Sequence, residues 1–332
     1  MTQVFKSQHR RHTVNNVKVR EYISGDSEKI SSFFTEQTPY LRDSTFWIWI
    51  NRMISDEKSI IIVAEFENKI IGHYAIIPQQ VNVFGKTYSA AFAIHAFIHP
   101  DFRKSFLIFQ ITKKMYKVAK EHGIDFLYGF PNENFRDIQI KADKWKQVSL
   151  FNSLEKDSTT FIDTNFSIIP IEDNYKDIYF LSEILDATTE KNNIYIQKSL
   201  NYYVNRYIRH PQKLYQNFFI VQNDQRVGFI CLKIYDNGQS KIGHLIDYIL
   251  IEDISFQDII QTIENYFHDK VSKLSVWKFS EDTRKILLNN NFKENGLQTF
   301  LGVKMLTNNE ELESTLVDFS NWNLCMGDSD AF

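Results

Sequence analysis

The 332-residue sequence is poor in cysteine, proline and glycine, with only 2, 6 and 11 residues of each type. The two cysteines, Cys231 and Cys325, lie too far apart and are too few to build a disulfide framework, and they favour a reducing compartment. With 43% hydrophobic and 24% charged residues, the sequence is too apolar for a disordered chain. We therefore expect a globular protein of about two domains.

A strong charge of one sign is also missing. The chain carries 38 basic and 41 acidic residues and a net charge of −3, which argues against a nucleic-acid partner. No apolar run approaches the roughly 18 residues that span a bilayer, and the first residues lack the apolar block of a signal peptide. No His, Cys or Asp cluster has metal-ligand spacing. We expect a cytoplasmic protein without a membrane span or a metal site.

Hydrophobic periodicity predicts the order β-α-α-β-β-β-α-β-α-β over residues 17–158, after a flexible arm at residues 1–16. One parallel crossover is indicated in this part. A strand ends near Ile98, a helix runs to about Glu121, and a short apolar strand follows at 126–129.

Residues 159–332 repeat this order in weaker form. The segment 218–232 echoes 60–76, because each consists of a strand, a polar turn and a second strand. Helices are predicted at 174–187 and 195–208, the second with a tyrosine-rich face that is typical of a core. An internal duplication explains the repeat. The expected fold class is α/β (an α+β mixed sheet) with two tandem domains, the second degenerate.

The segment AIHAFIHPDFR, residues 93–103, connects a strand to a helix. Pro100 ends the strand, and the first N–H groups of the following helix have no partners within the helix. These groups lie at the positive end of the helix dipole, where a pyrophosphate binds readily. Crossing to the next parallel strand splays the two strands apart and opens a cleft between them.

Three strings extend this pattern: HPDFRKSF at 99–106, GIDFLYGFPNENF at 123–135 and GDSDAF at 327–332. They resemble motifs of the GNAT acyltransferase superfamily and, more narrowly, of bacterial sugar N-acyltransferases of surface-polysaccharide clusters. The resemblance is clear over about 60–145 and faint over 160–305. It implies two tandem GNAT-fold domains, at 17–158 and 159–332, with a C-terminal tail that closes the acceptor site.

The resemblance also implies the chemistry. An acyl group, either acetyl or a short hydroxyacyl such as 3-hydroxybutanoyl, would pass directly from acyl-CoA to an amine. The acceptor would be a nucleotide-linked amino sugar, such as a dTDP-3-amino-3,6-dideoxyhexose used in O-antigen synthesis. Coenzyme A is the one cosubstrate expected, and no prediction of an oligomeric state follows.

The resemblance places coenzyme A at the splayed strand and at the start of the helix. Backbone N–H groups near Ala96, Phe97 and Ile98 would stabilise the oxyanion that develops during transfer. Asn132 and Asn134 would bond the pantetheine amides, although Asn132 also suits a helix N-cap. The pyrophosphate would be held by the loop residues Arg103, Lys104, Ser105, Phe106, Leu107 and Ile108.

This loop departs from the superfamily pattern, which is Arg/Gln-x-x-Gly-x-Gly/Ala. Phe106 and Ile108 stand where the glycines are expected, and their side chains narrow the approach of backbone to phosphate. We expect coenzyme A binding to persist with altered geometry, helped by the charges of Arg103 and Lys104. Loss of binding is the alternative. The second half has no such loop, so one coenzyme A per chain is expected.

His95 is the first candidate for the general base, because it lies on the strand that carries the oxyanion donors and its ordinary pKa near 6.5 suits the task. A histidine satisfied within the sheet is the alternative. Asp247 lies on the corresponding apolar strand of the second half, where it would hold the acceptor amine, orient a base, or pair with a lysine or arginine. Further substrate contacts are predicted at Tyr248, Trp277, Asp328 and Asp330. Trp277 would stack on a nucleotide base, unless it belongs to the core.

Two other functions fit parts of the pattern. A tandem GNAT fold also serves aminoacyl-tRNA-dependent ligases of peptidoglycan, but the acidic balance and the lack of a long helical arm argue against that function. A non-catalytic acyl-CoA-binding module is the other alternative, because the phosphate loop has lost its glycines.

Overall fold

The computed structural model describes residues 16–37, 44–52, 56–103, 105–188 and 193–330. The arm predicted at residues 1–16 lies outside these ranges except for its last residue. Lys104, one of the predicted loop contacts, also lies outside the described residues.

The first half follows the predicted order of elements. Its central helix, α3, buries Leu107, Ile111 and Met115 at helical spacing and ends before Gly123, which has a positive φ of 73°. In chain order the elements are β1 (Lys18–Glu21), α1 (Asp26–Gln37), α2 (Ser44–Arg52), β2 (Ile60–Phe66), β3 (Lys69–Val83), β4 (Lys86–Ile98), the 3₁₀ turn η2 (Pro100–Phe102), α3 (Leu107–Glu121), β5 (Phe126–Gly129), α4 (Glu133–Lys141) and β6 (Lys146–Asp157).

The second half differs from the prediction at residues 195–208. Its Ile-Tyr-Ile segment forms a strand that pairs with β3, and Ser199 then caps a short helix that continues as a π turn. The elements are β7 (Ser167–Pro170), α5 (Tyr175–Asp186), β8 (Ile194–Ile196), α6 (Leu200–Tyr203), the π turn η3 (Val204–Ile208), β9 (Gln216–Gln222), β10 (Gln225–Asp236), β11 (Lys241–Leu250), α7 (Phe256–Phe267), β12 (Lys273–Val276), α8 (Glu281–Asn289), β13 (Lys293–Met305), α9 (Glu310–Leu316), and the 3₁₀ turns η4 (Phe319–Asn321) and η5 (Met326–Asp328).

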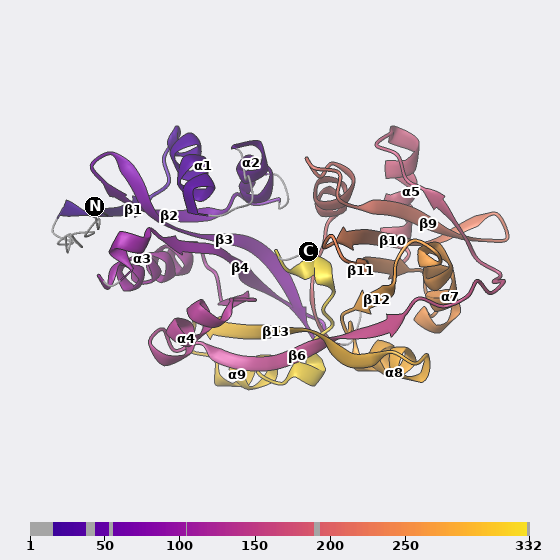
Figure 1. Ribbon diagram of the computed structural model, residues 1–332. Helices are drawn as coiled ribbons and strands as arrows, with labels where there is room; N and C mark the ends of the chain where they lie inside the picture. The colour runs from indigo at the N-terminus through magenta and orange to yellow at the C-terminus, as the bar shows by residue number, and fades with distance from the viewer. Residues whose placement is uncertain (1–15, 38–43, 53–55, 104, 189–192, 331–332) are drawn as a thin grey trace, which may run out of the picture.

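Thirteen strands of the described chain form one mixed sheet, in the order β1-β2-β3-β4-β5-β13-β6-β12-β11-β10-β9-β7, with β8 on β3. This sheet confirms the predicted fold class. The sequence analysis assigned no strand at β13, which lies between β5 and β6 and so completes the first half from near the end of the chain. β6 in turn pairs with β12, and β6 and β13 run along the lower edge in Figure 1. The sheet thus crosses residue 158, and the domain division there stays a prediction.

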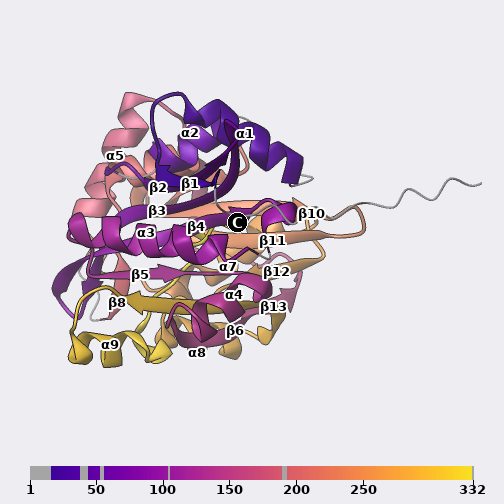
Figure 2. The same cartoon turned by 90° about the vertical axis from the view of Figure 1, so that its left-hand side faces the viewer.

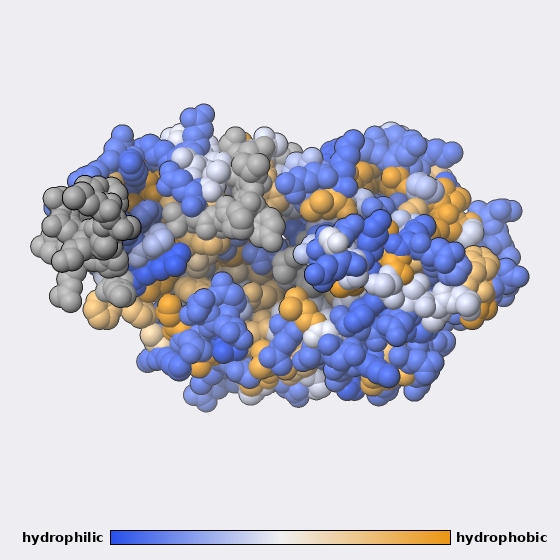
Figure 3. Space-filling model, in the orientation of Figure 1, coloured by the Kyte–Doolittle hydropathy of each residue, from blue (hydrophilic) through white to orange (hydrophobic). Residues whose placement is uncertain are grey.

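In the first half, helices pack on both faces of the sheet. Side chains of β2 alternate between two faces: Ile61 and Val63 pack with α1, whereas Ile62 and Ala64 pack with α3. Figure 2 shows α1 and α2 on one side of these strands. The cluster that includes α1 extends into the second half as far as Trp277 and Trp322. The two halves therefore share one hydrophobic core. The face in Figure 3 is mostly hydrophilic, with apolar side chains in its recesses.

Two of the histidines that are buried within this sheet have a lowered pKa. Burial lowers the pKa of both His73 on β3 and His244 on β11 to about 4. An ordinary histidine of the unfolded chain titrates near 6.5, so between pH 4 and 6.5 the unfolded chain binds more protons than the folded one. Stability therefore rises with pH across this window.

We predict that lowering the pH from 6.5 to 5 reduces the free energy of unfolding by about 2 kcal/mol for each of these histidines. Urea unfolding at a series of pH values measures the slope. His244→Gln should remove the share of one histidine, whereas His99→Gln, which changes a partly exposed side chain, should leave the slope unchanged. A flat stability profile between pH 5 and 6.5 would contradict the prediction.

Candidate active site

The parallel strands β4 and β5 pair over only three residues. Ala90, Ala91 and Phe92 face residues 126–128, and beyond them the strands diverge. A cavity of about 270 Å³ lies in the gap, between residues 93–97 of β4 and residues 130–132 after β5. We call it the first cleft. It lies at the splayed opening that the sequence predicts.

Local sequence explains why the strands part. His95 has a positive φ of 51°, and the pairing of β4 with β3 shifts at this position, which marks a β-bulge. On the other side Pro131 lacks an N–H group and cannot extend the pairing of β5. A left-handed conformation costs a residue with a Cβ about 1 kcal/mol or more, so the bulge is maintained by its surroundings.

His95 lies at the end of the first cleft and its side chain is nearly buried. Its Nε2 atom is 3.8 Å from a carboxylate oxygen of Asp330, which the C-terminal tail brings into the same cleft. The ring of Phe34 packs edge-on against the His95 ring, and His73 Nδ1 bonds the His95 carbonyl at 2.8 Å. The structure thus joins two predicted residues, His95 and Asp330, that are far apart in the sequence.

The predicted phosphate loop retains a left-handed residue where the superfamily has glycine. Phe106 has a φ of 55°, immediately before α3, and its side chain is 75% exposed. The expected narrowing by Phe106 is therefore corrected, because the ring points to solvent instead of across the helix start. Ile108 is half-buried and Leu107 is buried in the core beneath α3, so Leu107 offers only backbone to a ligand.

Two other loop side chains are occupied by local contacts. Arg103 Nε donates to the carbonyl of Ile98 at 3.1 Å, and the Ser105 hydroxyl donates to the carbonyl of Phe102 at 2.6 Å. His99 orders the loop by accepting a hydrogen bond from the Asp101 amide. The loop is therefore held by its own hydrogen bonds in the described residues.

The remaining predicted cosubstrate residues divide into two groups. Ala96, Phe97 and Asn132 line the first cleft, whereas Ile98 and Asn134 do not. Asn132 also caps α4 by accepting from the Phe135 amide, so both of its predicted roles are compatible. The sequence analysis missed the polar side chains Tyr74 and Gln139 at the base of the cleft, because they come from β3 and α4 without any motif.

A second, larger cavity lies at the equivalent place in the second half. β11 and β12 pair in parallel over residues 242–245 and 273–276 and then diverge. The gap of about 560 Å³ lies between residues 247–252, at the end of β11 and just after it, and the first turn of α8, and we call it the second cleft. The predicted residues Asp247, Tyr248 and Asp328 all line it.

A buried lysine lies at the end of the second cleft. Lys198 Nζ is 2.7 Å from Asp247, 2.8 Å from Asp328 and 3.0 Å from Cys325 Sγ. Burial opposes its charge, but the two carboxylates prevail and raise the pKa of Lys198 well above its ordinary value. The Tyr207 hydroxyl also donates to Asp247 at 2.8 Å. Asp247 thus pairs with a lysine, which is one of the alternatives that the sequence allowed. No signal in the sequence indicated that this lysine is Lys198.

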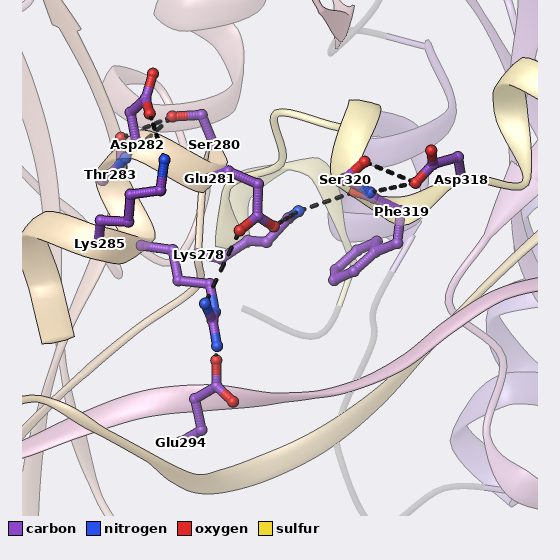
Figure 4. Close-up of polar contacts among 11 residues, drawn as sticks. Lys278, Ser280, Glu281, Asp282, Thr283, Lys285, Glu294, Asp318, Phe319 and Ser320 are labelled. Carbon is purple, nitrogen blue, oxygen red and sulfur yellow. Dashed lines mark hydrogen bonds and ion pairs between the residues drawn. The ribbon is translucent and has the colours of Figure 1, made fainter.

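The C-terminal tail, residues 317–330 of the described chain, is buried at 322–329 between the halves, where Figure 1 draws it in yellow. Tyr202 donates to the Gly327 carbonyl at 3.0 Å, and the buried Arg206 donates to the Ser329 carbonyl at 2.6 Å. Nearer its start, buried Lys278 bonds both Glu281 and the Phe319 carbonyl at 2.8 Å, which joins the tail to α8 (Figure 4). The tail is therefore fixed along its length up to Asp330.

Trp277 does not line either cleft. Its side chain is 1% exposed and packs against Phe130 and Phe151 in the shared core. The expectation of an open ring for base stacking is therefore corrected in favour of the core position. Tyr248, in contrast, faces the second cleft and pairs with Thr283 at 3.1 Å between hydroxyl oxygens.

Within the described residues, no group of three or more His, Cys, Asp or Glu side chains is placed to hold a metal ion. No helix there is both long and apolar enough to cross a membrane.

Comparison with known proteins bears on the first half. Residues 29–136 match a family model described as an acetyltransferase (GNAT) domain, which spans α1 to the start of α4 and includes the first cleft. Residues 29–136 are thus similar to a GNAT acetyltransferase domain. This match supports an acyl-CoA-dependent N-acyltransferase. No curated protein matches the sequence significantly.

Solved structures show that the GNAT fold extends over most of the chain. A GCN5-related N-acetyltransferase from Anabaena variabilis is 14% identical, with a TM-score of 0.64 over 88% of this chain and 73% of that chain. A GCN5-related N-acetyltransferase from Kribbella flavida is 7% identical, with a TM-score of 0.63 over 88% and 72%. N-myristoyltransferase from Saccharomyces cerevisiae with bound myristoyl-CoA is 11% identical, with a TM-score of 0.57 over 87% and 82%. At these identities the likeness concerns the fold.

The left-handed Phe106 leads to a testable prediction about the GNAT loop. Phe106→Gly should stabilise the protein by about 1 kcal/mol by relieving backbone strain, and it should tighten coenzyme A binding because glycine lets the backbone approach a phosphate without a Cβ. Phe84→Gly is the matched control, because Phe84 also has a positive φ, of 49°, but lies in a hairpin away from the cleft. Thermal unfolding and calorimetric titration with coenzyme A measure the two effects. Tighter binding in both variants, or in neither, would refute the loop's role.

The buried lysine generates a second prediction. Lys198→Met leaves Asp247 and Asp328 without their cation, which should cost about 3–5 kcal/mol of unfolding free energy. Lys285→Met removes an exposed partner of Asp282 and should cost less than about 1 kcal/mol. Chemical denaturation compares the two variants. Equal losses would show that the Lys198 cluster does not hold the tail.

Proposed function

We propose that this GNAT-fold protein transfers an acyl group from acyl-CoA to the amine of a nucleotide-linked amino sugar, by direct attack in a ternary complex. The observation that carries the proposal is the first cleft, where the part of β4 that no longer pairs with β5 carries a histidine that faces a carboxylate. The acceptor class rests on the resemblance of the strings at 99–106, 123–135 and 327–332 to sugar N-acyltransferases. A cytoplasmic location, where acyl-CoA is available, is part of the proposal.

The residues present in the first cleft suit an acyl-CoA cosubstrate. Beyond Phe92 the backbone of β4 has no strand partner on the β5 side, and buried peptide groups need hydrogen bonds. The pantetheine arm carries amides that would satisfy this edge and Asn132. The amides at the start of α3 and the charge of Arg103 would hold the pyrophosphate. The thioester would then lie near Ala96 and Phe97.

The chemistry needs a proton acceptor and an oxyanion donor. The acceptor amine attacks the thioester carbonyl, and the backbone N–H groups near Ala96 and Phe97 stabilise the negative charge on the carbonyl oxygen. His95 accepts the proton that the amine loses, and the Asp330 carboxylate at 3.8 Å stabilises the resulting imidazolium. Collapse of the intermediate releases coenzyme A as its thiolate, which takes up a proton, and the acyl group remains on nitrogen as an amide.

The acceptor would approach from the second half. Asp247, Tyr248 and Asp328 line the second cleft, and the tail runs from this cleft to Asp330 in the first. Ser329 has extended backbone angles, so Asp328 and Asp330 are about 7 Å apart along the chain. The two clefts thus approach one another along the tail, in keeping with its proposed part in closing the acceptor site.

A thiol-release assay with acetyl-CoA and 3-hydroxybutanoyl-CoA against a panel of nucleotide-linked amino sugars tests this function. We expect acceptor-dependent release, and a decrease in kcat of about 100-fold or more in His95→Gln with a changed pH–rate profile. Asp330→Asn should show a smaller decrease of the same kind. His122→Gln, which changes a histidine at the end of α3 outside the cleft, is the control. Unchanged kinetics in His95→Gln would assign the base elsewhere.

A thermal-shift measurement beside the thiol-release assay separates the other two functions. A non-catalytic acyl-CoA-binding module would show a thermal shift with coenzyme A but no acceptor-dependent thiol release. A peptidoglycan ligase would be stabilised by charged tRNA rather than by coenzyme A.

A further inference from the structure

The bulge in β4 contains a residue whose own preference does not explain it. His73 of β3 pairs with Phe97 of β4. Two residues further along β3, Ala75 pairs with Ile94, which lies three residues earlier in β4. β4 therefore has one extra residue here, and His95 lies in the bulge with a positive φ of 51°. Bulges with a left-handed residue usually place glycine there, so the surroundings must hold His95 in this conformation.

The same bulge sets the face of the sheet on which His95 lies. Before the bulge, the odd-numbered Ala93 packs on the side of α3. After it, the odd-numbered Phe97 packs on the side of α1, where the ring of Phe34 contacts both Phe97 and His95. Without the extra residue, His95 would follow the alternation of Ala93 and face α3. The bulge thus turns the imidazole toward Asp330 of the tail.

A buried side chain of the neighbouring strand bonds this bulge. His73 is fully buried, and its Nδ1 atom lies 2.8 Å from the carbonyl oxygen of His95. A carbonyl oxygen only accepts, so Nδ1 carries the proton and donates it to the bond. Burial lowers the pKa of His73 to about 4, so the ring is neutral at ordinary assay pH and keeps this tautomer. The bond therefore ties the strained residue to β3.

The rest of the His73 ring makes apolar contacts. Its Nε2 atom has no hydrogen-bond partner within the described part of the chain. The ring packs edge-on against Phe34, with 5.0 Å between ring centroids. Burying a ring nitrogen without a partner costs free energy that an apolar side chain would not cost. The bond to the His95 carbonyl is what an imidazole supplies at this position and an apolar side chain does not.

We propose that His73 is a positioning residue: its hydrogen bond to the His95 carbonyl maintains the left-handed bulge and so keeps the His95 imidazole on the face of the sheet where Asp330 lies. His73 does not line the first cleft, so it acts through His95. Loss of the bond leaves a buried carbonyl without this donor and lets residue 95 leave its strained conformation. The effect on the bulge stands by itself, whereas the effect on transfer rests on the proposed function.

Two substitutions separate the hydrogen bond from the packing. His73→Asn places an amide N–H close to the position of Nδ1 but leaves a cavity in the core. His73→Leu fills most of the volume of the ring without a donor. If His73 only packs, the leucine variant should be closer to the wild type; if it positions His95, the asparagine variant should be closer. His73→Val, which suits a strand, replaces the leucine variant if that variant does not fold.

Amide hydrogen exchange of the ligand-free full chain measures the bulge directly. We expect residues 93–98 to exchange at least about tenfold faster in His73→Leu, and within about threefold of the wild type in His73→Asn. Residues 218–221 of β9, in the second half, are the internal reference and should exchange alike in all three proteins. Equal exchange of residues 93–98 in the two variants, or faster exchange in His73→Asn, would overturn the proposal.

The thiol-release assay measures the consequence for transfer. We expect kcat to fall about tenfold or more in His73→Leu and less than about threefold in His73→Asn, with little change in the KM for acyl-CoA. Combining His73→Leu with His95→Gln should cost much less than the product of the two single losses, because His73 acts through His95. Losses that multiply would contradict the positioning role. Absence of transfer in the wild type would count against the proposed function alone, and hydrogen exchange would still decide the role of His73 at the bulge.

Discussion

The loss of hydrogen bonding between β4 and β5 after Phe92 is the constraint on which the rest of the structure depends. Two parallel strands that stop pairing leave a row of peptide groups on each side, and a buried row must find other partners. The bulge at His95 bends β4 away, and Pro131 prevents β5 from following. These two local features create the first cleft and also place an imidazole at its end.

The second element that organises the molecule is the C-terminal tail. It contributes a carboxylate to each cleft, with Asp328 beside Lys198 and Asp330 beside His95. A buried lysine between two carboxylates adds little net stability compared with apolar packing, but its loss is costly, so it specifies one position for the tail. Hydrogen bonds from Tyr202 and Arg206 to the tail also fix it in this position. The geometry of the first cleft therefore depends on side chains of the second half.

Local pattern predicted most of the fold and the position of the cleft. The strand to Ile98, the helix α3 and the short strand β5 were legible because periodicity, Pro100 and Gly123 mark their ends. β13 was not assigned, and its place between β5 and β6 joins residues about 150 apart, which no local signal encodes. Periodicity predicted one helix at residues 195–208, because the apolar residues of β8 and of the π turn have the spacing of a helix.

The candidate site was likewise predicted only where a local signal marks its residues. His95, Asp247 and the tail were singled out by strand position and motif, whereas Lys198 became important only through a tertiary contact with two distant aspartates. The side chain of Phe106 lies differently from the expectation. Its bulk predicted an obstructed loop, but the backbone adopts the left-handed turn of a glycine and turns the ring outward. Residue type alone did not reveal which way the side chain would point.

Amide hydrogen exchange in the presence and absence of coenzyme A tests the central claim most directly. If the part of β4 beyond its pairing with β5 holds the cosubstrate, protection should increase at residues 93–97 and at the start of α4, while residues 247–251 of the second cleft remain unchanged. Protection confined to the second cleft, or no change at the edge of β4 with saturating coenzyme A, would contradict the account.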